Sequence, residues 1–316
     1  MGKKFLMTDQ PDATPHALPS TGTALLAALI STFTSSFAWI FISQVVAVFG
    51  VLNSAAAQRL IASTILLLML LLQGQRLPTW REIRPHLPAL LGTILLCQVF
   101  ASFFVLSSML YTSSSKVMFL TKLEPYLVLL LGVLCFREKV TRTSILLLGV
   151  HFSGAFLLSF GGDASLGGSQ FGDLLLIGGI LLNATGYGFS ARLAKIFGAL
   201  RISVVTQIGS LLLFTPLLIF GTPLHEINPA HISLGASSLV INVLLYSVIA
   251  TTTWFYALKG LPGWLVSALR ALGPVLAAPV AWLMLGEHLN LTQSLGAAII
   301  VTTSFGLVYE RRSVRS

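Results

Sequence analysis

The chain has 316 residues, of which 55% are hydrophobic and only 9% are Asp, Glu, Lys or Arg, and its formal net charge is +9. Soluble domains carry roughly 25% charged residues, so this composition excludes a chain whose surface faces mainly water. The basic residues lie in short loops between apolar segments, as they do in membrane proteins, and this argues against nucleic acid as a partner.

Ten apolar segments follow one another along the chain, and a helix of about 20 apolar residues is long enough to cross a bilayer. The segments are 23–49, 52–73, 87–110, 115–136, 143–160, 173–191, 202–220, 234–258, 264–285 and 292–309. Each predicts a helix, because hydrocarbon offers no partner to an unpaired backbone group. We therefore predict an all-α integral membrane protein with ten transmembrane helices. Cys97 and Cys135 fall inside these segments and are expected to be small core residues.

The distribution of Lys and Arg predicts how the helices are oriented. If the N-terminus is cytoplasmic, 15 of the 19 basic residues lie on the cytoplasmic side and only Lys116 lies outside. Residues 1–20 are then expected to form a flexible cytoplasmic tail, and residues 311–316 a short basic one. The predicted location is the cell (inner or plasma) membrane, crossed several times, with both termini in the cytoplasm.

An internal repeat relates the two halves of the chain at an offset of 149 residues. The matching residues are Val117, Leu120, Leu123, Pro125, Leu127, Leu134 and Glu138 in the first half, and Val266, Leu269, Leu272, Pro274, Leu276, Leu283 and Glu287 in the second. The matched Pro and Glu are informative in a Leu-rich chain. We predict five-helix repeats over 21–160 and 172–310. Five is an odd number, so the second repeat is inverted, an arrangement that suits alternating access around a midplane site.

Short motifs recur at corresponding places in the two halves. They are Leu123-Glu124-Pro125 followed by Arg137-Glu138, Leu272-Gly273-Pro274 followed by Gly286-Glu287, Tyr256-Ala257-Leu258-Lys259, and Gly172-Asp173-Leu174-Leu175. With these motifs the chain resembles the EamA family of the drug/metabolite transporter superfamily. Phe33 and Thr34 depart from the family's opening motif, where Trp and Gly are usual. The resemblance implies a ten-helix exporter or exchanger of small metabolites, in which helices 1, 3, 4, 6, 8 and 9 surround a central cavity.

Four charged residues lie inside the predicted spans, where a charge costs about 2.5–3.5 kcal/mol on insertion scales and is often functional. Lys122 and Arg270 lie shortly before the matched prolines, and they would suit a carboxylate or phosphate group of a solute. Glu124 could pair with Arg270, bind an amine or carry a proton. A structural ion pair is the alternative for these three residues. Arg59 is expected to anchor its helix by reaching the membrane surface or by pairing there.

Prolines, span-end carboxylates and polar or aromatic residues complete the candidate site. Pro125 and Pro274 each remove a backbone hydrogen bond, which suits a hinge or gate. Glu138 and Glu287 are predicted gate residues, with solvated helix ends as the alternative. The further candidates for binding the solute are Asn183, Tyr187, Trp39 and Tyr256. For the aromatic residues, packing at the membrane interface is the alternative.

These features predict a secondary transporter, an exporter or exchanger of small metabolites such as amino acids or other anionic or amphiphilic solutes. The chain has no Gly-x-x-x-x-Gly-Lys-[Ser/Thr] loop for ATP, and no cofactor, metal or catalytic residue is expected. The alternatives are an intramembrane enzyme, although no His-Glu-x-x-His or Gly-x-Ser-x-Gly motif is present, and a structural membrane protein without transport. The predicted partners are a small solute and the lipid bilayer, and a homodimer is left open.

Overall fold

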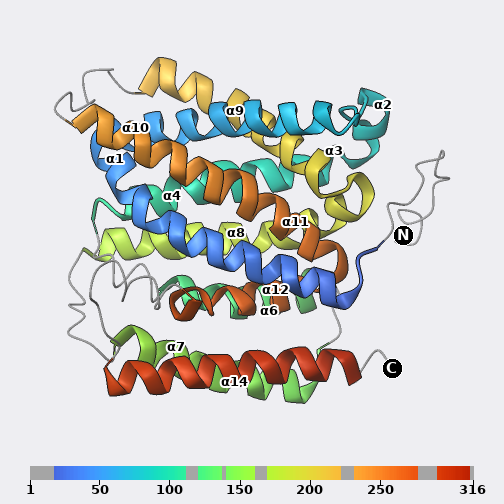
Figure 1. The fold of residues 1–316 in the computed structure, drawn as a ribbon, viewed down its shortest axis with the longest axis vertical. Helices are drawn as coiled ribbons and strands as arrows, with labels where there is room; N and C mark the ends of the chain where they lie inside the picture. The colour runs from blue at the N-terminus through green and yellow to red at the C-terminus, as the bar shows by residue number, and fades with distance from the viewer. Residues whose placement is uncertain are drawn as a thin grey trace.

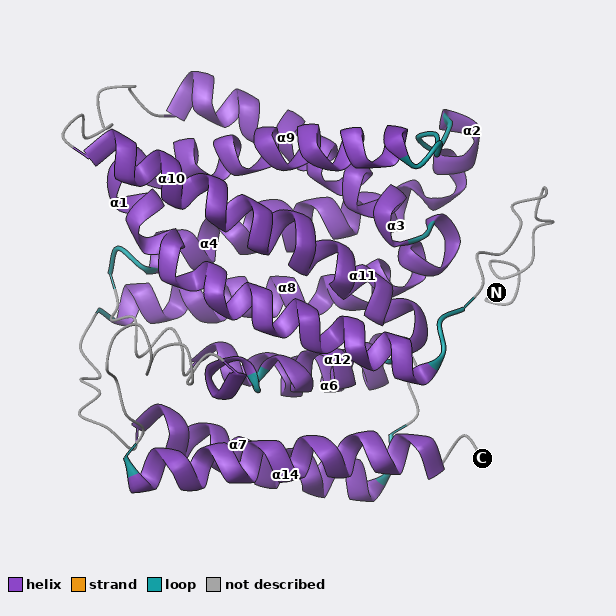
Figure 2. Cartoon of the chain, viewed as in Figure 1, coloured by secondary structure: helices purple, strands orange, loops and turns teal. Residues whose placement is uncertain are grey.

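The computed structural model describes residues 18–111, 120–136, 140–160, 169–221, 231–276 and 290–313. Within these ranges, the side chains at positions 39–40, 43, 122, 136, 159–160, 217–221 and 311–313 lie outside the description. Nearly all of the described residues are helical, and none of them forms a strand (Figure 2). The predicted all-helical class is confirmed for this part of the chain.

The helices follow one another with short connections. The first half of the chain contains α1 (Thr21–Leu72), α2 (Trp80–Ile83), the 3₁₀ turn η1 (Arg84–His86), α3 (Leu87–Gly92), the π-helix η2 (Thr93–Phe100), α4 (Ala101–Ser108), the 3₁₀ turn η3 (Thr121–Leu123), α6 (Glu124–Phe136) and α7 (Arg142–Phe160). The second half contains α8 (Gln170–Phe197), α9 (Ala199–Gly221), α10 (Ile232–Asn242), the π-helix η6 (Val243–Ala250), α11 (Thr251–Gly260), α12 (Gly263–Arg270) and α14 (Leu291–Ser313).

Seven helical segments of the described part are long and apolar enough to cross a membrane. They are Thr21–Ala38, Gln44–Leu72, Trp80–Ser108, Gln170–Phe197, Ala199–Pro216, Ile232–Gly260 and Leu291–Glu310, and Glu124–Cys135 and Arg142–Leu158 are shorter apolar helices. The chain is therefore a multi-pass helical membrane protein. The predicted span 264–285 runs into residues 277–289, which lie outside the described ranges, so the number of ten spans stays a prediction.

Two glycines with positive φ mark abrupt changes of direction between long helices. Gly50 (φ 72°, ψ 171°) is the residue at which α1 departs from helical geometry, so α1 consists of two helices that meet at a kink, and the boundary predicted between the spans 23–49 and 52–73 falls at this residue. Gly198 (φ 83°) separates α8 from α9. Glycine adopts this conformation at little cost because it has no Cβ atom. The chain therefore changes direction at single residues, without a loop.

The long helices run roughly side by side, and α7 and α14 pack along each other at one edge of the molecule (Figure 1). Helix α1 packs against α9, α10, η6 and α11, while α8 packs against α4 and α6. Two glycines permit close approaches between these helices: a β-carbon at Gly186 would collide with the Cys97 sulfur, and one at Gly273 with the Ser36 hydroxyl. Small residues of this kind are usual where membrane helices touch.

Two π-helical segments interrupt long helices near their middle. The segment η2 lies between α3 and α4, and η6 lies between α10 and α11. Isolated π turns are frequent at functional sites, because the extra residue re-aims the side chains around it. Cys97 of η2 and Tyr246 of η6 both line one cavity between the helices.

Candidate functional site

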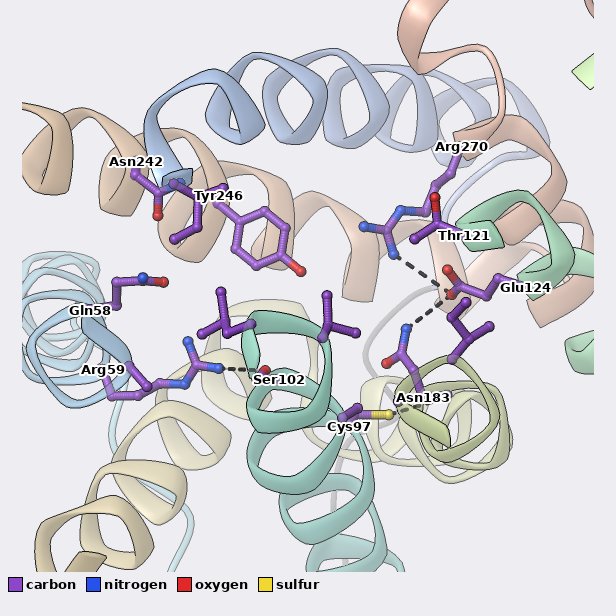
Figure 3. Close-up of a pocket in the computed structure, with 17 residues that line it drawn as sticks. Gln58, Arg59, Cys97, Ser102, Thr121, Glu124, Asn183, Asn242, Tyr246 and Arg270 are labelled. Atoms are coloured by element: carbon purple, nitrogen blue, oxygen red, sulfur yellow. Dashed lines mark hydrogen bonds and ion pairs between the residues drawn. The ribbon is translucent and has the colours of Figure 1, made fainter. Parts of the chain in front are cut away.

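A cavity of about 110 Å³ lies between the helices (Figure 3). The polar residues that line it are Gln58, Arg59, Cys97, Ser102, Thr121, Glu124, Asn183, Asn242, Tyr246 and Arg270. They come from α1, η2, α4, η3, α6, α8, α10, η6 and α12. Residues from both halves of the sequence therefore meet in one cavity.

Glu124 enters this cavity from the first turn of α6. The 3₁₀ turn η3 ends at Leu123, and α6 begins directly afterwards. Pro125 is buried in that first turn. Leu120, the residue before η3, is helical as well, so Pro125 follows a short 3₁₀ irregularity between two helical stretches.

Glu124 is held by two residues from the second half of the chain. Asn183 of α8 donates a hydrogen bond of 3.0 Å from Nδ2 to Glu124 Oε1. Arg270, the last residue of α12, has its Nη1 3.9 Å from the same oxygen. The Glu124 side chain is 13% exposed and that of Arg270 is 24% exposed, so water screens this ion pair less than one at a protein surface.

Tyr187 of α8 supports Arg270 from the protein interior. Arg270 Nη1 donates to the Tyr187 hydroxyl oxygen at 3.3 Å. Tyr187 is buried, and its ring meets that of Trp254 edge to face, with 5.1 Å between the ring centroids. The tyrosine is thus positioned by packing, and it offers an oxygen to the guanidinium without being part of the cavity lining. Of the predicted residues, the structure brings together Glu124, Arg270, Asn183 and Tyr187.

The other predicted residues lie elsewhere or outside the described part. Tyr256 is 36% exposed and is not part of the cavity lining; the Lys259 Nζ lies 5.8 Å from its ring centroid. Pro274 is half-buried and follows the turn after α12. The side chains of Trp39 and Lys122 and the whole of Glu138 and Glu287 lie outside the described residues.

Arg59 was expected to reach the membrane surface or to pair there, and the structure places its side chain inside the protein instead. It is 3% exposed and lines the cavity. Its Nη2 donates to the Gln98 carbonyl oxygen at 3.0 Å and to Ser102 Oγ at 2.9 Å. The guanidinium carbon lies 6.0 Å from the ring centroid of Phe214. Packing of α1 against α4 and α9 holds the arginine inside the protein, where snorkelling to water is impossible.

Six more residues of the polar lining were not predicted to lie there, namely Gln58, Cys97, Ser102, Thr121, Asn242 and Tyr246. Asn242 lies inside a predicted span, as Asn183 does, so the argument that a mid-span amide seeks a partner away from lipid applies to it equally. Gln58 stands next to Arg59 in the sequence. Two adjacent polar residues inside an apolar segment are the signal that could have predicted that this part of the segment lines a cavity.

Comparison with known proteins agrees with this architecture. A solved crystal structure superposes with a TM-score of 0.74 at 18% sequence identity, covering 94% of this chain and 100% of the other, which shows the fold alone. The protein named "Uncharacterized transporter YetK" of Bacillus subtilis (strain 168) is 23% identical over 270 residues, which are 82% of this chain and 78% of that protein. The model of the EamA-like transporter family matches residues 22–160 and again residues 170–309. This multi-pass membrane protein therefore belongs to the EamA-like transporter family and is a membrane transporter.

Proposed function

We propose that the chain is a secondary transporter of small metabolites that works by alternating access around the cavity of Figure 3. The solutes that we propose are amino acids or other small anionic or amphiphilic metabolites, carried outward or in exchange. The proposed location is the cell membrane, with both termini in the cytoplasm, because the basic residues are biased to that side. The family consists of transporters, which agrees with the prediction that the chain is not an enzyme.

The observation that carries the proposal is the ion pair between Glu124 and Arg270. It joins α6 of the first half to α12 of the second half at the wall of a cavity. This ion pair can separate when the two halves move relative to each other. A charged group of a solute can then take the place of one partner. Intramembrane charges beside a cavity usually serve transport, since a purely apolar contact would be cheaper to insert.

Matched irregularities support two related halves of five helices, the second inverted. Gly50 and Gly198 both have positive φ and lie 148 residues apart. The π-helices η2 and η6 lie 150 residues apart, and the matched prolines lie 149 residues apart. The two matches of the family model, one per half, point the same way. Repeats of this kind suit rocking of one half against the other.

The size of the cavity supports small solutes. Its volume of about 110 Å³ is well below the roughly 300–1,000 Å³ of sites for drug-sized ligands. Its lining is mainly apolar, and amide, hydroxyl, carboxylate and guanidinium groups converge on it from several helices. Such groups fix the orientation of a polar solute and exclude a purely apolar one.

The test is exchange of labelled solutes by the purified chain in liposomes. A panel of amino acids and small organic acids is loaded inside, and uptake of the labelled solute is followed against empty liposomes. We expect exchange of at least one solute, and loss of most of that exchange in Glu124→Gln and in Arg270→Gln, with Arg192→Gln as the exposed control. Absence of exchange across the panel, or exchange that both variants retain in full, would contradict the proposal.

A further inference from the structure

A second positive charge lines the cavity on the side away from the Glu124–Arg270 pair. Figure 3 shows Arg59 on one wall and the ion pair on another, with Ser102 and Tyr246 between them. Arg59 is 3% exposed, and the two groups that accept hydrogen bonds from its Nη2, the Gln98 carbonyl and the Ser102 hydroxyl, are both neutral. Among the described residues, no carboxylate lies within 4.0 Å of its guanidinium.

The charges of the described lining therefore do not cancel. Glu124 and Arg270 neutralise each other, and Arg59 leaves the cavity with one positive charge in excess. A buried cation is stable when an opposite charge or a complete set of hydrogen bonds offsets its lost hydration. The aromatic ring of Phe214 at 6.0 Å is a weaker partner than an anion would be.

Three residues that line this side of the cavity each have a buried polar atom without a hydrogen-bond partner in the described structure. Arg59 Nε and Gln58 Nε2 are buried donors without a hydrogen-bond partner in the described structure. Gln58 and Asn242 are 4% and 2% exposed, and the Asn242 Oδ1 atom likewise lacks a partner there. All three residues line the cavity on one side of Figure 3. Folded proteins leave few buried polar atoms unpaired, so these atoms at the cavity wall are places where a bound group could complete the hydrogen bonds.

We propose that Arg59, with Gln58 beside it, binds the carboxylate of the transported solute, and that the solute is a small monocarboxylate. The inference rests on the proposed function and names its substrate class. A carboxylate carries the single negative charge that the lining lacks, and its two oxygens accept from two converging donors at once. A planar guanidinium matches that geometry better than an ammonium group does. The far end of the solute then faces Glu124 and Asn183.

The test compares carboxylates with the corresponding amides, which differ only in the group that Arg59 binds. The full chain, purified in detergent, is titrated with alanine, lactate and propionate and with alaninamide, lactamide and propionamide, and its thermal unfolding is measured. Sodium chloride and sodium phosphate are titrated at matched ionic strength. The variants are Arg59→Gln and Gln58→Glu, and Arg192→Gln is the control because Arg192 is exposed on α8.

We expect the carboxylates to raise the melting temperature saturably and the amides not to. Arg59→Gln weakens the apparent affinity for carboxylates by about tenfold or more, the loss typical of one hydrogen bond to a charged group. Gln58→Glu supplies a carboxylate from the protein itself, so this variant melts higher without solute and no longer responds to carboxylates. Arg192→Gln behaves as the wild type.

Several results would overturn the inference. They are an equal response to carboxylates and amides, no response of the wild type to any carboxylate, a full response to chloride or phosphate alone, or unchanged carboxylate affinity in Arg59→Gln. If Arg59→Gln does not fold, Gln58→Glu decides alone, and a full carboxylate response in it overturns the inference.

Exchange of the same probes in liposomes separates this inference from the proposed function. Binding that depends on Arg59 without any exchange supports the carboxylate site and contradicts transport of these solutes. Exchange that survives Arg59→Gln supports transport and contradicts the carboxylate site.

Discussion

Asn183 of α8 donates a 3.0 Å hydrogen bond to the same carboxylate oxygen of Glu124 that faces Arg270. A neutral donor and a cation therefore share one acceptor at the cavity wall. This geometry fixes the carboxylate between two helices of the second half, and changes at either partner have distinct consequences.

Replacing Asn183 with Asp places a second carboxylate next to Glu124. The two negative charges repel each other in a poorly hydrated site, and Arg270 can neutralise only one of them. We expect lower thermal stability and loss of most solute exchange. Asn183→Leu removes only the hydrogen bond, and we expect exchange to fall about tenfold, since a hydrogen bond to a charged group is worth about 1.5–3 kcal/mol. Equal stability of wild type and Asn183→Asp would contradict the described contact.

Removing the hydroxyl group of Tyr187 tests its support of Arg270. Tyr187→Phe keeps the ring that packs on Trp254 but removes the oxygen that accepts from Arg270. We expect a stability loss of about 1–2 kcal/mol and a weaker affinity for the exchanged solute. The matched control is Tyr126→Phe, because Tyr126 donates its hydroxyl to the Leu148 carbonyl and is not part of the cavity lining. The control should lose stability alone; loss of affinity in both variants would contradict a specific role for Tyr187.

The bend in α1 depends on glycine at position 50. Gly50 has φ 72° and ψ 171°, a conformation that residues with a β-carbon adopt at a cost of about 1–3 kcal/mol. Gly50→Ala should therefore lower the melting temperature, as measured by thermal unfolding in detergent.

Gly149→Ala is the control, since Gly149 lies within helix α7 with no atom within 4 Å of an added β-carbon. Because alanine favours helix over glycine by about 0.5–1 kcal/mol, this control should be neutral or stabilising. An unchanged melting temperature in Gly50→Ala would mean that the bend has another geometry.

A carboxylate of α14 caps the start of α7. Glu310 accepts hydrogen bonds from the hydroxyl groups of Thr141 and Ser144, the second at 2.6 Å, and Thr141 Oγ1 in turn accepts from the Ser144 backbone N–H. A negative charge at a helix N-terminus is stabilising. Glu310→Leu should cost about 1–3 kcal/mol of stability and leave exchange unchanged per folded molecule, because Glu310 does not line the cavity. The neighbouring exposed Tyr309→Leu is the control for stability, and a loss of exchange by folded Glu310→Leu would show that this cap is coupled to transport.

Much of the fold could be predicted because membrane insertion is governed by local composition. Apolar stretches of helix length, separated by short basic loops, identify helical spans wherever they occur in the sequence. The matched Pro125 and Pro274 pointed to related halves, and the structure shows a helix irregularity immediately before each of them. The family motifs around these prolines led to the same family that the comparisons identify.

The candidate site was predictable only in part. The charges inside spans singled out Glu124 and Arg270, and these residues do meet. The position of Arg59 along its span predicts a side chain at the membrane surface. That position says nothing about which neighbouring helix covers the side chain, so the prediction was wrong. Tyr256, in turn, belongs to a family-like motif but is exposed, beside Lys259.

The sequence by itself thus determined that this protein is a helical membrane protein of a transporter family, because hydropathy, charge bias and motif spacing are properties of the chain read in order. Only the tertiary structure decided that Asn183 shares Glu124 with Arg270 and that Arg59 faces the cavity with unpaired neighbours. The physical reason is that the direction of a side chain depends on how each helix is rotated and packed. Bends at glycine, π turns and close helix contacts between distant parts of the chain set that rotation.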